Sequence, residues 1–206
     1  MSEVSTIFLD LFGTLMYLAN ETKPYKRLFA DLGLQTPQEL QDARTIALSE
    51  DFENLSQLVA RIKPGSKIDL TSYEREVEEE CASAKLYPET LSVLKELKRR
   101  EKTLFLISNL ASPYKKPFFD LGLAPYFSQV LFSCKEGLIK DDIKIYQRAL
   151  QRSNVDPSLV IMFGDKTRND VEGPQQVGIR GILVDRENEH KVKEKINSLE
   201  GVLQYC

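Results

Sequence analysis

The chain has 206 residues, of which 42% are hydrophobic and 29% are charged. This length and composition suffice for one folded core with an insertion, and they do not indicate disorder. The formal net charge of −3 argues against a broad nucleic-acid surface, because phosphate backbones are bound by clustered Lys and Arg. Small molecules or proteins are therefore the expected partners, and the sequence leaves the oligomeric state open.

The cysteines and the lone histidine indicate the setting of the protein. Cys81, Cys134 and Cys206 are widely spaced and form no C-x-x-C pair, which favours neither a disulfide framework nor a zinc site. His190 lies in a polar stretch, so we expect it at the surface and expect no histidine-dependent triad. No apolar run approaches the roughly 18 residues that span a bilayer, and no signal-peptide pattern is present. These features predict a cytoplasmic protein that binds no membrane.

The first apolar run, residues 7–9, ends at Asp10 and is followed by Gly13. This pattern predicts a buried strand that places a carboxylate beside an open turn. Burying a carboxylate costs several kcal/mol unless a cation or hydrogen bonds compensate it. Asp10 is therefore a candidate functional residue.

Residues 17–87 are expected to form helices separated by turns. Residues 36–39 have the pattern of a capping box with a proline at the first helical position, which predicts a helix start. Residues 71–74 predict a second capping box and helix start, and the acidic run at 76–80 is expected to face solvent. The whole insert is expected to be helical.

After Pro88 the pattern changes to alternating helices and strands. Strands are expected at residues 103–107, 129–133, 160–163 and 181–184, and helices at 91–97, 113–121, 142–151 and 170–177. This alternation is typical of a parallel sheet with crossover helices. The sequence thus predicts an α/β core with a helical insertion after its first strand.

Three polar residues, Asp10, Ser108 and Asp165, each follow a predicted strand. Ligands of open α/β sheets bind outside the carboxyl ends of the strands, so these residues are expected to converge at one edge. Asp170 follows five residues after Asp165 and can turn back to the same place. Carboxylates so close repel one another unless a cation offsets them, and oxygen ligands of this kind suit Mg²⁺.

Lys140, from the loop after the third strand, adds a positive charge, and Ser108 with Asn109 adds neutral donors. This combination suits a phosphoryl group held by donors, a lysine and a metal while Asp10 attacks. Alone, each of these residues is ordinary turn or surface chemistry. Together, and in this strand context, they indicate a catalytic site.

These motifs resemble those of the haloacid dehalogenase superfamily of hydrolases over nearly the whole chain. The family's first motif, Asp-x-Asp-Gly-Thr, resembles residues 10–14, and its second, a Ser or Thr ending a strand, matches Ser108. The third motif is similar to residues 137–143, where Lys140 is kept and both prolines are absent. The fourth, Gly-Asp followed by a second acid, matches residues 164–165 and Asp170.

The resemblance implies an α/β fold with a Rossmann-like core at residues 1–16 and 88–206 and a helical cap at residues 17–87. It also implies that Asp10 forms an aspartyl-phosphate and that Mg²⁺ is the cofactor. Catalysis would depend on Asp10, Ser108 and Lys140. The substrate would be bound by Gly13, Thr14 and Asn109, and the metal by Asp10, the backbone carbonyl of Phe12, Asp165 and Asp170.

Phe12 departs from this pattern. Phosphatases of the family carry a second acid here, which protonates the leaving oxygen and then activates water. Proton transfer of this kind contributes about 10² to 10⁴-fold, and a phenyl ring cannot perform it. Its loss would leave a slow phosphatase, a reaction whose leaving group needs no proton, or no catalysis. The leading hypothesis is a Mg²⁺-dependent phosphatase acting on a small phosphorylated metabolite.

Two alternatives to the phosphatase hypothesis stay open. The first is a carbon–halogen hydrolase, because the family's dehalogenases carry an aromatic residue at this position. They dispense with the metal and lack the Gly-Asp form of the fourth motif, which this chain keeps at residues 164–165. The second alternative is a non-catalytic phosphate-binding or interaction protein. The cap residues that would set specificity cannot be assigned from the sequence.

Overall fold

A six-stranded parallel sheet forms the centre of the computed structural model, which describes residues 4–206. The strand order is β5-β4-β1-β6-β7-β8, and each neighbouring pair is parallel. The chain builds outward from β1 on one side and then on the other, so the strand order reverses at β1. The predicted α/β fold is confirmed. The strands are β1 (Thr6–Leu9), β4 (Thr103–Ser108), β5 (Gln129–Phe132), β6 (Val160–Gly164), β7 (Arg180–Val184) and β8 (Lys195–Ile196).

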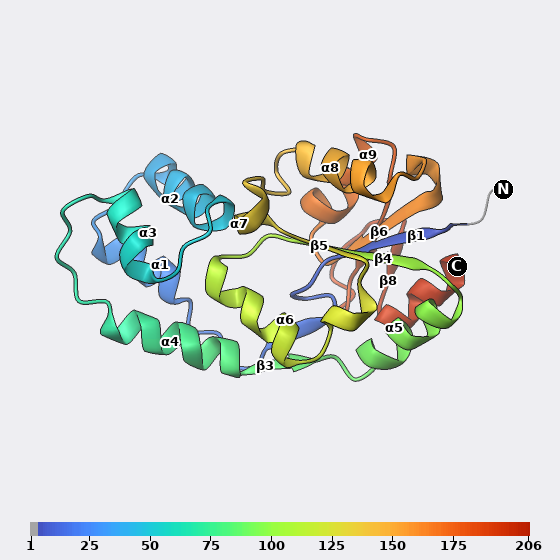
Figure 1. The fold of residues 1–206 in the computed structure, drawn as a ribbon, viewed down its shortest axis with the longest axis horizontal. Helices are drawn as coiled ribbons and strands as arrows, with labels where there is room; N and C mark the ends of the chain where they lie inside the picture. The colour runs from blue at the N-terminus through green and yellow to red at the C-terminus, as the bar shows by residue number, and fades with distance from the viewer. Residues whose placement is uncertain (1–3) are drawn as a thin grey trace.

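Helices cover both faces of this sheet (Figure 1). Successive side chains of β1 point to opposite faces, as strand geometry requires. Phe8 packs in one hydrophobic cluster with Ile145 of α8 (Lys144–Ser153), whereas Ile7 packs in another with Leu94 of α5 (Thr90–Arg99). Burial on both faces explains why β1 is apolar up to Asp10.

Short helices connect the remaining strands or, in the case of η5, follow the last strand. They are η1 (Ser112–Lys115), α6 (Lys116–Asp120), η2 (Ala124–Tyr126), α7 (Ser133–Glu136), η3 (Pro157–Leu159), η4 (Thr167–Glu172), α9 (Gly173–Gln175) and η5 (Leu199–Tyr205). The helix expected at residues 170–177 begins earlier and is not regular, because η4 is a π-helical turn that contains Asp170. Such turns are frequent at functional sites.

Four helices between residues 24 and 82 form a separate unit beyond the end of the sheet (Figure 1). Their buried residues form a hydrophobic cluster that includes Leu28, Ala43, Leu58 and Val77. The helices are α1 (Pro24–Asp31), α2 (Pro37–Ser49), α3 (Leu55–Ile62) and α4 (Thr71–Ala82). We call this unit the helical insert.

A two-stranded antiparallel ribbon connects the helical insert to the sheet. It pairs β2 (Met16–Leu18) with β3 (Ala84–Leu86). The expectation that residues 17–87 are entirely helical is therefore wrong at both ends. Strands of three residues are too short to show an alternating pattern, and their pairing spans the whole insert.

One of the two expected capping boxes is present. Thr36 Oγ1 accepts from Glu39 N at 3.2 Å, and Glu39 Oε2 accepts from Thr36 N at 2.9 Å. The second is wrong, since the cap position of α4 is Leu70 and no side chain caps it. Asp69 Oδ1 accepts from the backbone N of Thr71 at 3.0 Å instead. A carboxylate just before the helix thus takes the place of the expected threonine.

Glu80 was expected to face solvent with the rest of its acidic run, and this is wrong. It is buried, and Oε1 accepts from the backbone N of Lys23 at 2.7 Å and from that of Thr22. Helix α1 has no side-chain cap of its own, so Glu80 satisfies donors at its start. Glu80 also accepts from the Tyr114 hydroxyl, which joins the helical insert to η1 of the core.

The remaining composition-based expectations concern isolated residues. His190 is exposed, as expected. The cysteines are free thiols, with Cys81 and Cys134 buried. Within residues 4–206, none of the helices combines the length and apolar character that crossing a membrane requires.

Candidate active site

Three carboxylates meet at the carboxyl edge of the sheet, as the sequence predicts. Asp10 directly follows β1, Asp165 follows β6, and Asp170 lies in η4. Their oxygens lie within 4.8 Å of one another. Asp10 and Asp170 are buried, whereas Asp165 is partly exposed.

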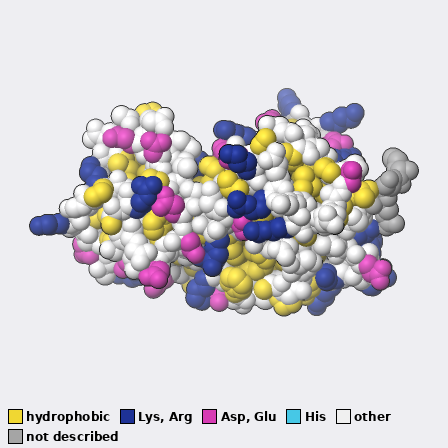
Figure 2. Space-filling model, turned by 45° about the horizontal axis from the view of Figure 1, so that its top comes forward, with side chains coloured by type: hydrophobic (Ala, Val, Ile, Leu, Met, Phe, Trp, Pro, Cys, Tyr) yellow, Lys and Arg dark blue, Asp and Glu magenta, His cyan; other side chains and the backbone are white. Residues whose placement is uncertain are grey.

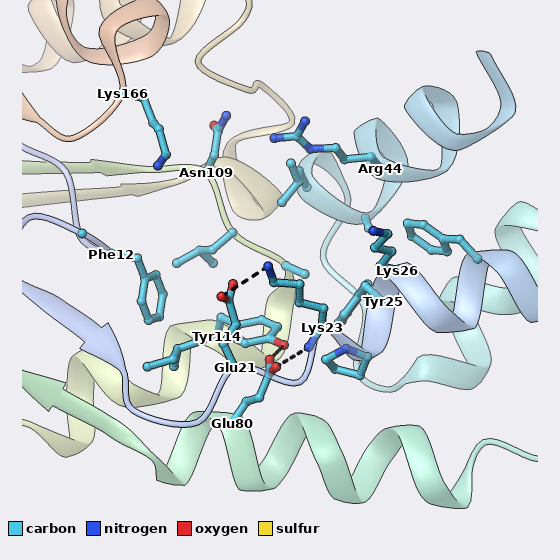
Figure 3. A pocket seen from close by; sticks show the side chains of 18 of the residues that line it. Phe12, Glu21, Lys23, Tyr25, Lys26, Arg44, Glu80, Asn109, Tyr114 and Lys166 are labelled. Carbon is cyan, nitrogen blue, oxygen red and sulfur yellow. Dashed lines mark hydrogen bonds and ion pairs between the residues drawn. The ribbon is translucent and has the colours of Figure 1, made fainter. Parts of the chain in front are cut away.

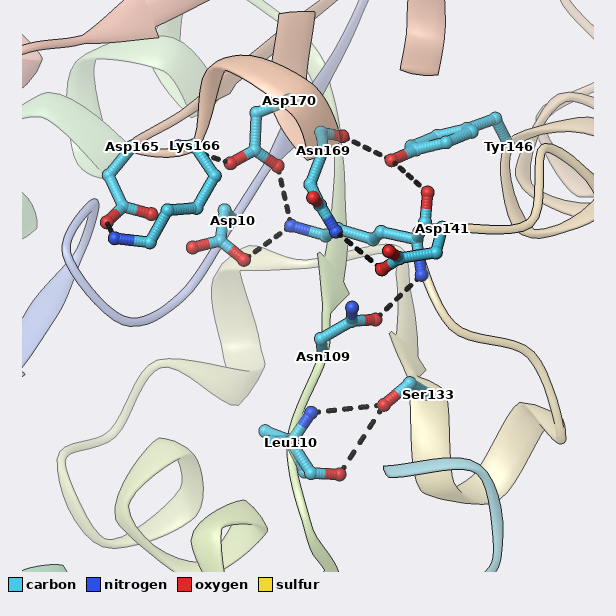
Figure 4. Close-up of polar contacts among 11 residues, drawn as sticks. Asp10, Asn109, Leu110, Ser133, Asp141, Tyr146, Asp165, Lys166, Asn169 and Asp170 are labelled. Carbon is cyan, nitrogen blue, oxygen red and sulfur yellow. Dashed lines mark hydrogen bonds and ion pairs between the residues drawn. The ribbon is translucent and has the colours of Figure 1, made fainter. Parts of the chain in front are cut away.

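Lys140 pairs with two of these carboxylates, those of Asp10 and Asp170. Figure 4 shows the three carboxylates of the cluster. Lys140 Nζ is 2.5 Å from Asp10 Oδ1 and 2.7 Å from Asp170 Oδ1, and its side chain is only 3% exposed. The backbone of Lys140 is also held, because its N–H donates to Asn109 Oδ1 at 2.8 Å and its carbonyl accepts from the Tyr146 hydroxyl at 3.2 Å. These contacts fix the lysine from both ends.

A second lysine lies on the outer side of the cluster. Lys166 Nζ is 2.7 Å from Asp165 Oδ2, and Lys166 N donates to Asp170 Oδ2 at 3.0 Å. When all three are ionised, the carboxylates exceed the two ammonium groups by one negative charge. Buried carboxylate oxygens with excess negative charge are the ligands that Mg²⁺ prefers, so the residues fit a magnesium ion.

Two glycines permit the close packing of this cluster. A Cβ on Gly13, which has a φ of 81°, would lie 2.4 Å from Asp165 Oδ2. A Cβ on Gly164 would lie 2.2 Å from Asp170 Cγ. The glycines of the first and fourth motifs are thus needed because carboxylates occupy the space of their missing side chains.

The charges in the cluster affect one another. Burial raises the pKa of Asp10 to about 7; Lys140 opposes this shift, and Asp170 and Asp165 add to it. The neighbouring Asp10 and Asp170 raise the pKa of Lys140 against the effect of its burial. Lys140 is therefore a fixed positive charge. A divalent cation on the carboxylates would favour the ionised form of Asp10.

The other predicted site residues lie around this cluster. Ser108 is the buried last residue of β4, the neighbour of β1. The buried Thr14 Oγ1 has no hydrogen-bond partner among the described residues. The Gly13 N–H already donates to Met16 O at 2.8 Å. Asn109, predicted as a donor to substrate, uses its carboxamide oxygen to hold the Lys140 loop.

Lys166 was not predicted from the sequence, and three further residues of the site were missed as well. Ser133 Oγ accepts from Leu110 N at 3.0 Å, and the Tyr146 hydroxyl donates to backbone carbonyls beside the cluster. Arg186 donates to carbonyls of the loop after Asp10. Arg186 follows β7 closely, so the strand-end rule that selects Asp165 could have selected it too.

A cavity of about 1050 Å³ opens between the cluster and the helical insert. Phe12, Asn109, Asp165 and Lys166 line its core side, and α1, α2 and the connections of the insert line the other (Figure 3). The Phe12 ring packs edge-on to Tyr114, with ring centroids 6.3 Å apart. Figure 2 shows basic side chains gathered beside the junction of insert and core.

Two basic residues of the insert side lie in this cavity without an ion pair among the described residues. Arg44 of α2 points toward Asn109, and Lys26 of α1 lies beside it (Figure 3). Lys23, by contrast, pairs with Glu21 at 3.6 Å. The cavity thus offers positive charge opposite the carboxylate cluster, which suits an anionic ligand that spans both sides.

Solved structures of similar fold include phosphatases and dehalogenases. A HAD phosphatase from Thermococcus onnurineus superposes with a TM-score of 0.68 at 20% identity, covering 97% of this chain and 96% of that one. A 2-haloacid dehalogenase from Pseudomonas syringae pv. Tomato DC3000 has a TM-score of 0.66 at 21% identity, covering 98% and 97%. At these identities the likeness establishes the fold.

Relatives in sequence carry phosphatase names. A phosphoserine phosphatase of Thermus thermophilus is 36% identical over 102 residues, which are 49% of this chain and 41% of that protein. A glyceraldehyde 3-phosphate phosphatase of Methanothermobacter thermautotrophicus is 32% identical over 102 residues, 49% of this chain and 45% of that protein. The matches span less than half the length of these relatives.

A family model extends the resemblance to most of the chain. The model, described as haloacid dehalogenase-like hydrolase, matches residues 4–178. The matched region contains the four strand-end motifs and the helical insert, so the residues that form the carboxylate cluster lie within the match. The chain therefore belongs to the haloacid dehalogenase-like hydrolase family.

Proposed function

We propose that this protein is a Mg²⁺-dependent phosphatase acting on a small phosphorylated molecule, with Asp10 as the nucleophile. The observation that carries the proposal is the buried cluster of three carboxylates around Lys140, beside a cavity large enough for a metabolite. The names of the sequence relatives support phosphate esters as the substrate class.

Asp10 would attack phosphorus and form an aspartyl-phosphate, releasing the alcohol, and water would then hydrolyse this intermediate. Lys140, held by Asn109 and Tyr146, provides a fixed positive charge next to the attacking carboxylate. The unpartnered Thr14 hydroxyl suits a phosphoryl oxygen, and Ser108 would add a second donor. These interactions would orient the phosphoryl group and balance its charge.

The metal would be held by Asp10, Asp165, Asp170 and the backbone carbonyl of Phe12. A bound Mg²⁺ supplies positive charge that neutralises the phosphoryl oxygens and orients them. Asp170 also pairs with the Lys140 ammonium and accepts from the backbone N–H of Lys166, so it serves the arrangement of the cluster as well.

Phe12 provides no proton for the leaving group. Hydrolysis by this site therefore favours substrates whose leaving group departs without protonation, such as aryl or acyl phosphates. With alkyl phosphates, water in the cavity would have to supply the proton, and turnover would be slow.

The helical insert is proposed to act as a cap that sets specificity. Residues 17–87 would form this cap domain, and residues 1–16 and 88–206 the core. Arg44 and Lys26 would attract a second anionic group of the substrate at the far end of the cavity. We propose that the protein acts in the cytoplasm.

The experiment is a phosphate release assay with a panel of phosphate esters, with and without Mg²⁺, on wild type and Asp10→Asn. The proposal predicts activity that requires Mg²⁺ and is lost in Asp10→Asn. Activity that survives Asp10→Asn, or that persists in chelator, refutes the mechanism.

Phe12 is the observation that favours a second candidate, a carbon–halogen hydrolase in which Asp10 attacks carbon. Halide needs no proton to leave, so an aromatic residue at this position would not slow the departure of the leaving group. Release of halide from a 2-haloacid in the presence of chelator would support it. A protein inactive in both assays that still binds inorganic phosphate would instead be a binding protein.

A further inference from the structure

Arg186 follows β7 at the carboxyl edge of the sheet and contacts the loop after Asp10. Its Nη2 donates to the Thr14 carbonyl at 2.8 Å and its Nε to the Gly13 carbonyl at 3.4 Å. Within residues 4–206, no turn or loop backbone N–H donates to either carbonyl. The guanidinium therefore satisfies two acceptors of the loop that carries the nucleophile motif.

The same guanidinium contacts the chain where it returns from the helical insert. Its Nη1 donates to Glu89 Oε1 at 2.7 Å, and its Cζ lies 3.4 Å from the centroid of the Tyr87 ring. Tyr87 follows β3, and its backbone N donates to Leu15 O at 3.2 Å. Arg186 thus joins the outgoing and the returning connections of the insert to the sheet.

The loop that Arg186 holds is packed against a proposed metal ligand. Gly13 lies so close to Asp165 that even a Cβ would clash with its carboxylate at 2.4 Å. A displacement of the Gly13 backbone would therefore change the separation of Asp10 and Asp165. The side chains of Arg186 and Glu89 are only 16% and 13% exposed, so their ion pair is shielded and geometrically fixed.

We propose that Arg186 is a positioning residue for the active site. It holds the loop at residues 13–14 and the end of β3 in the arrangement that lets Asp10 and Asp165 bind one metal ion. A planar fork with several donors can contact two carbonyls, a carboxylate and an aromatic ring at once, whereas a lysine cannot. The proposal rests on the proposed function for the metal site and for its catalytic consequence.

The test compares Arg186→Lys and Arg186→Met with wild type. Lysine keeps a positive charge for Glu89, so this variant is designed to stay folded if the methionine variant does not. Titration with Mg²⁺ alone by calorimetry should show affinity weakened about 10- to 100-fold in both variants, because partners that orient metal ligands have effects of this size. With p-nitrophenyl phosphate, kcat should fall by about the same factor. KM should change less than about twofold, because Arg186 does not line the cavity.

Arg180→Met is the matched control. Arg180 lies at the start of the same strand, β7, pairs with Glu194 at 2.7 Å and lies over the Tyr205 ring at 5.1 Å. It thus makes the same two kinds of contact as Arg186, far along the strand from the carboxylate cluster. Its loss should lower the melting temperature and leave Mg²⁺ affinity and kcat unchanged.

Wild-type Mg²⁺ affinity in folded Arg186→Lys or Arg186→Met would overturn the proposal, as would an equal loss of affinity in Arg180→Met. A wild type that binds Mg²⁺ but hydrolyses no phosphate refutes the proposed function alone, and the calorimetric comparison still decides the role of Arg186. A wild type that binds no Mg²⁺ overturns both.

Discussion

Replacing Phe12 by aspartate should convert a slow site into a faster one. Phe12 lines the cavity two residues after Asp10, and its backbone forms a β-bridge with Met16. A carboxyl group here could protonate a leaving oxygen and then activate water. Such proton transfer contributes about 10² to 10⁴-fold, so kcat for an alkyl phosphate should rise by that order. The gain in kcat/KM for p-nitrophenyl phosphate, which reports the phosphorylation of Asp10 and not the later attack of water, should be less than about tenfold, because nitrophenolate leaves unprotonated.

The same substitution should cost stability when no metal is present. The edge-on contact of Phe12 with Tyr114, at an interplanar angle of 84°, is lost, and such pairs contribute about 0.5–1.5 kcal/mol. A further carboxylate would also repel Asp165 and Asp10. Urea denaturation should show a total loss of about 1–3 kcal/mol in the free energy of unfolding, smaller when Mg²⁺ is added.

Phe12→Asn is the control, since asparagine matches aspartate in size and transfers no proton. Steady-state phosphate release should therefore rise in Phe12→Asp and not in Phe12→Asn. Equal rates in the two variants, or an equal gain in kcat/KM on alkyl and nitrophenyl substrates, would refute the argument that a missing proton donor limits this site.

Three other perturbations examine the cluster, the cavity and a loop away from them. Lys140→Met should abolish phosphate release. It should also lower the free energy of unfolding, measured in urea without Mg²⁺, by about 3–5 kcal/mol, because Asp10 and Asp170 lose their buried partner. An unchanged free energy of unfolding contradicts this. Arg44→Leu should raise KM about tenfold for an alkyl phosphate that also bears a carboxylate, and it should leave KM unchanged for the same alkyl phosphate without the carboxylate. Equal effects on the KM of both substrates exclude a second anion site. Asp185 accepts hydrogen bonds from Lys195 and His190, which hold the pKa of its carboxyl well below the usual range. The carboxylate therefore stabilises the folded chain at any pH above the pKa that Asp185 has in the unfolded chain, and this stabilisation is lost as the pH falls through the pKa that it has in the folded chain. Asp185→Asn should therefore flatten the acid side of the melting-temperature profile, and an unchanged acid side contradicts this.

The position of the carboxylate cluster could be predicted from the sequence because it depends on one rule. Asp10 and Asp165 follow apolar runs, and parallel strands present their carboxyl ends at one edge. Neither side chain needs a precise distant contact to arrive there. The α/β fold was predictable for the same reason, since five of the six strands are visible as short apolar runs. The strand β8, which has only two residues, Lys195 and Ile196, shows no such run and was missed.

The contacts that orient the cluster could not be predicted in this way. Asn109 holds the backbone of Lys140, Glu80 satisfies donors of a helix 57 residues away, and Arg186 reaches Thr14 across 172 residues. Asn109, Glu80 and Arg186 are all polar residues of kinds that are equally common at exposed positions. The hydrogen-bond partner of each residue depends on how whole helices and strands pack together, and no local sequence pattern reveals this packing.

The carboxylate cluster lowers the stability of the folded chain, which is a reason to expect that the site binds a ligand. Buried Asp10 and Asp170 repel each other and lose solvation, and Lys140 offsets only part of this. Gly13 and Gly164 add conformational entropy to the unfolded chain so that carboxylates can pack against them. A cation that binds the cluster would stabilise the folded chain and offset this loss of stability, whether or not turnover follows. In the proposed mechanism turnover depends separately on the proton that Phe12 cannot supply, and so metal affinity and leaving-group dependence should respond to different substitutions.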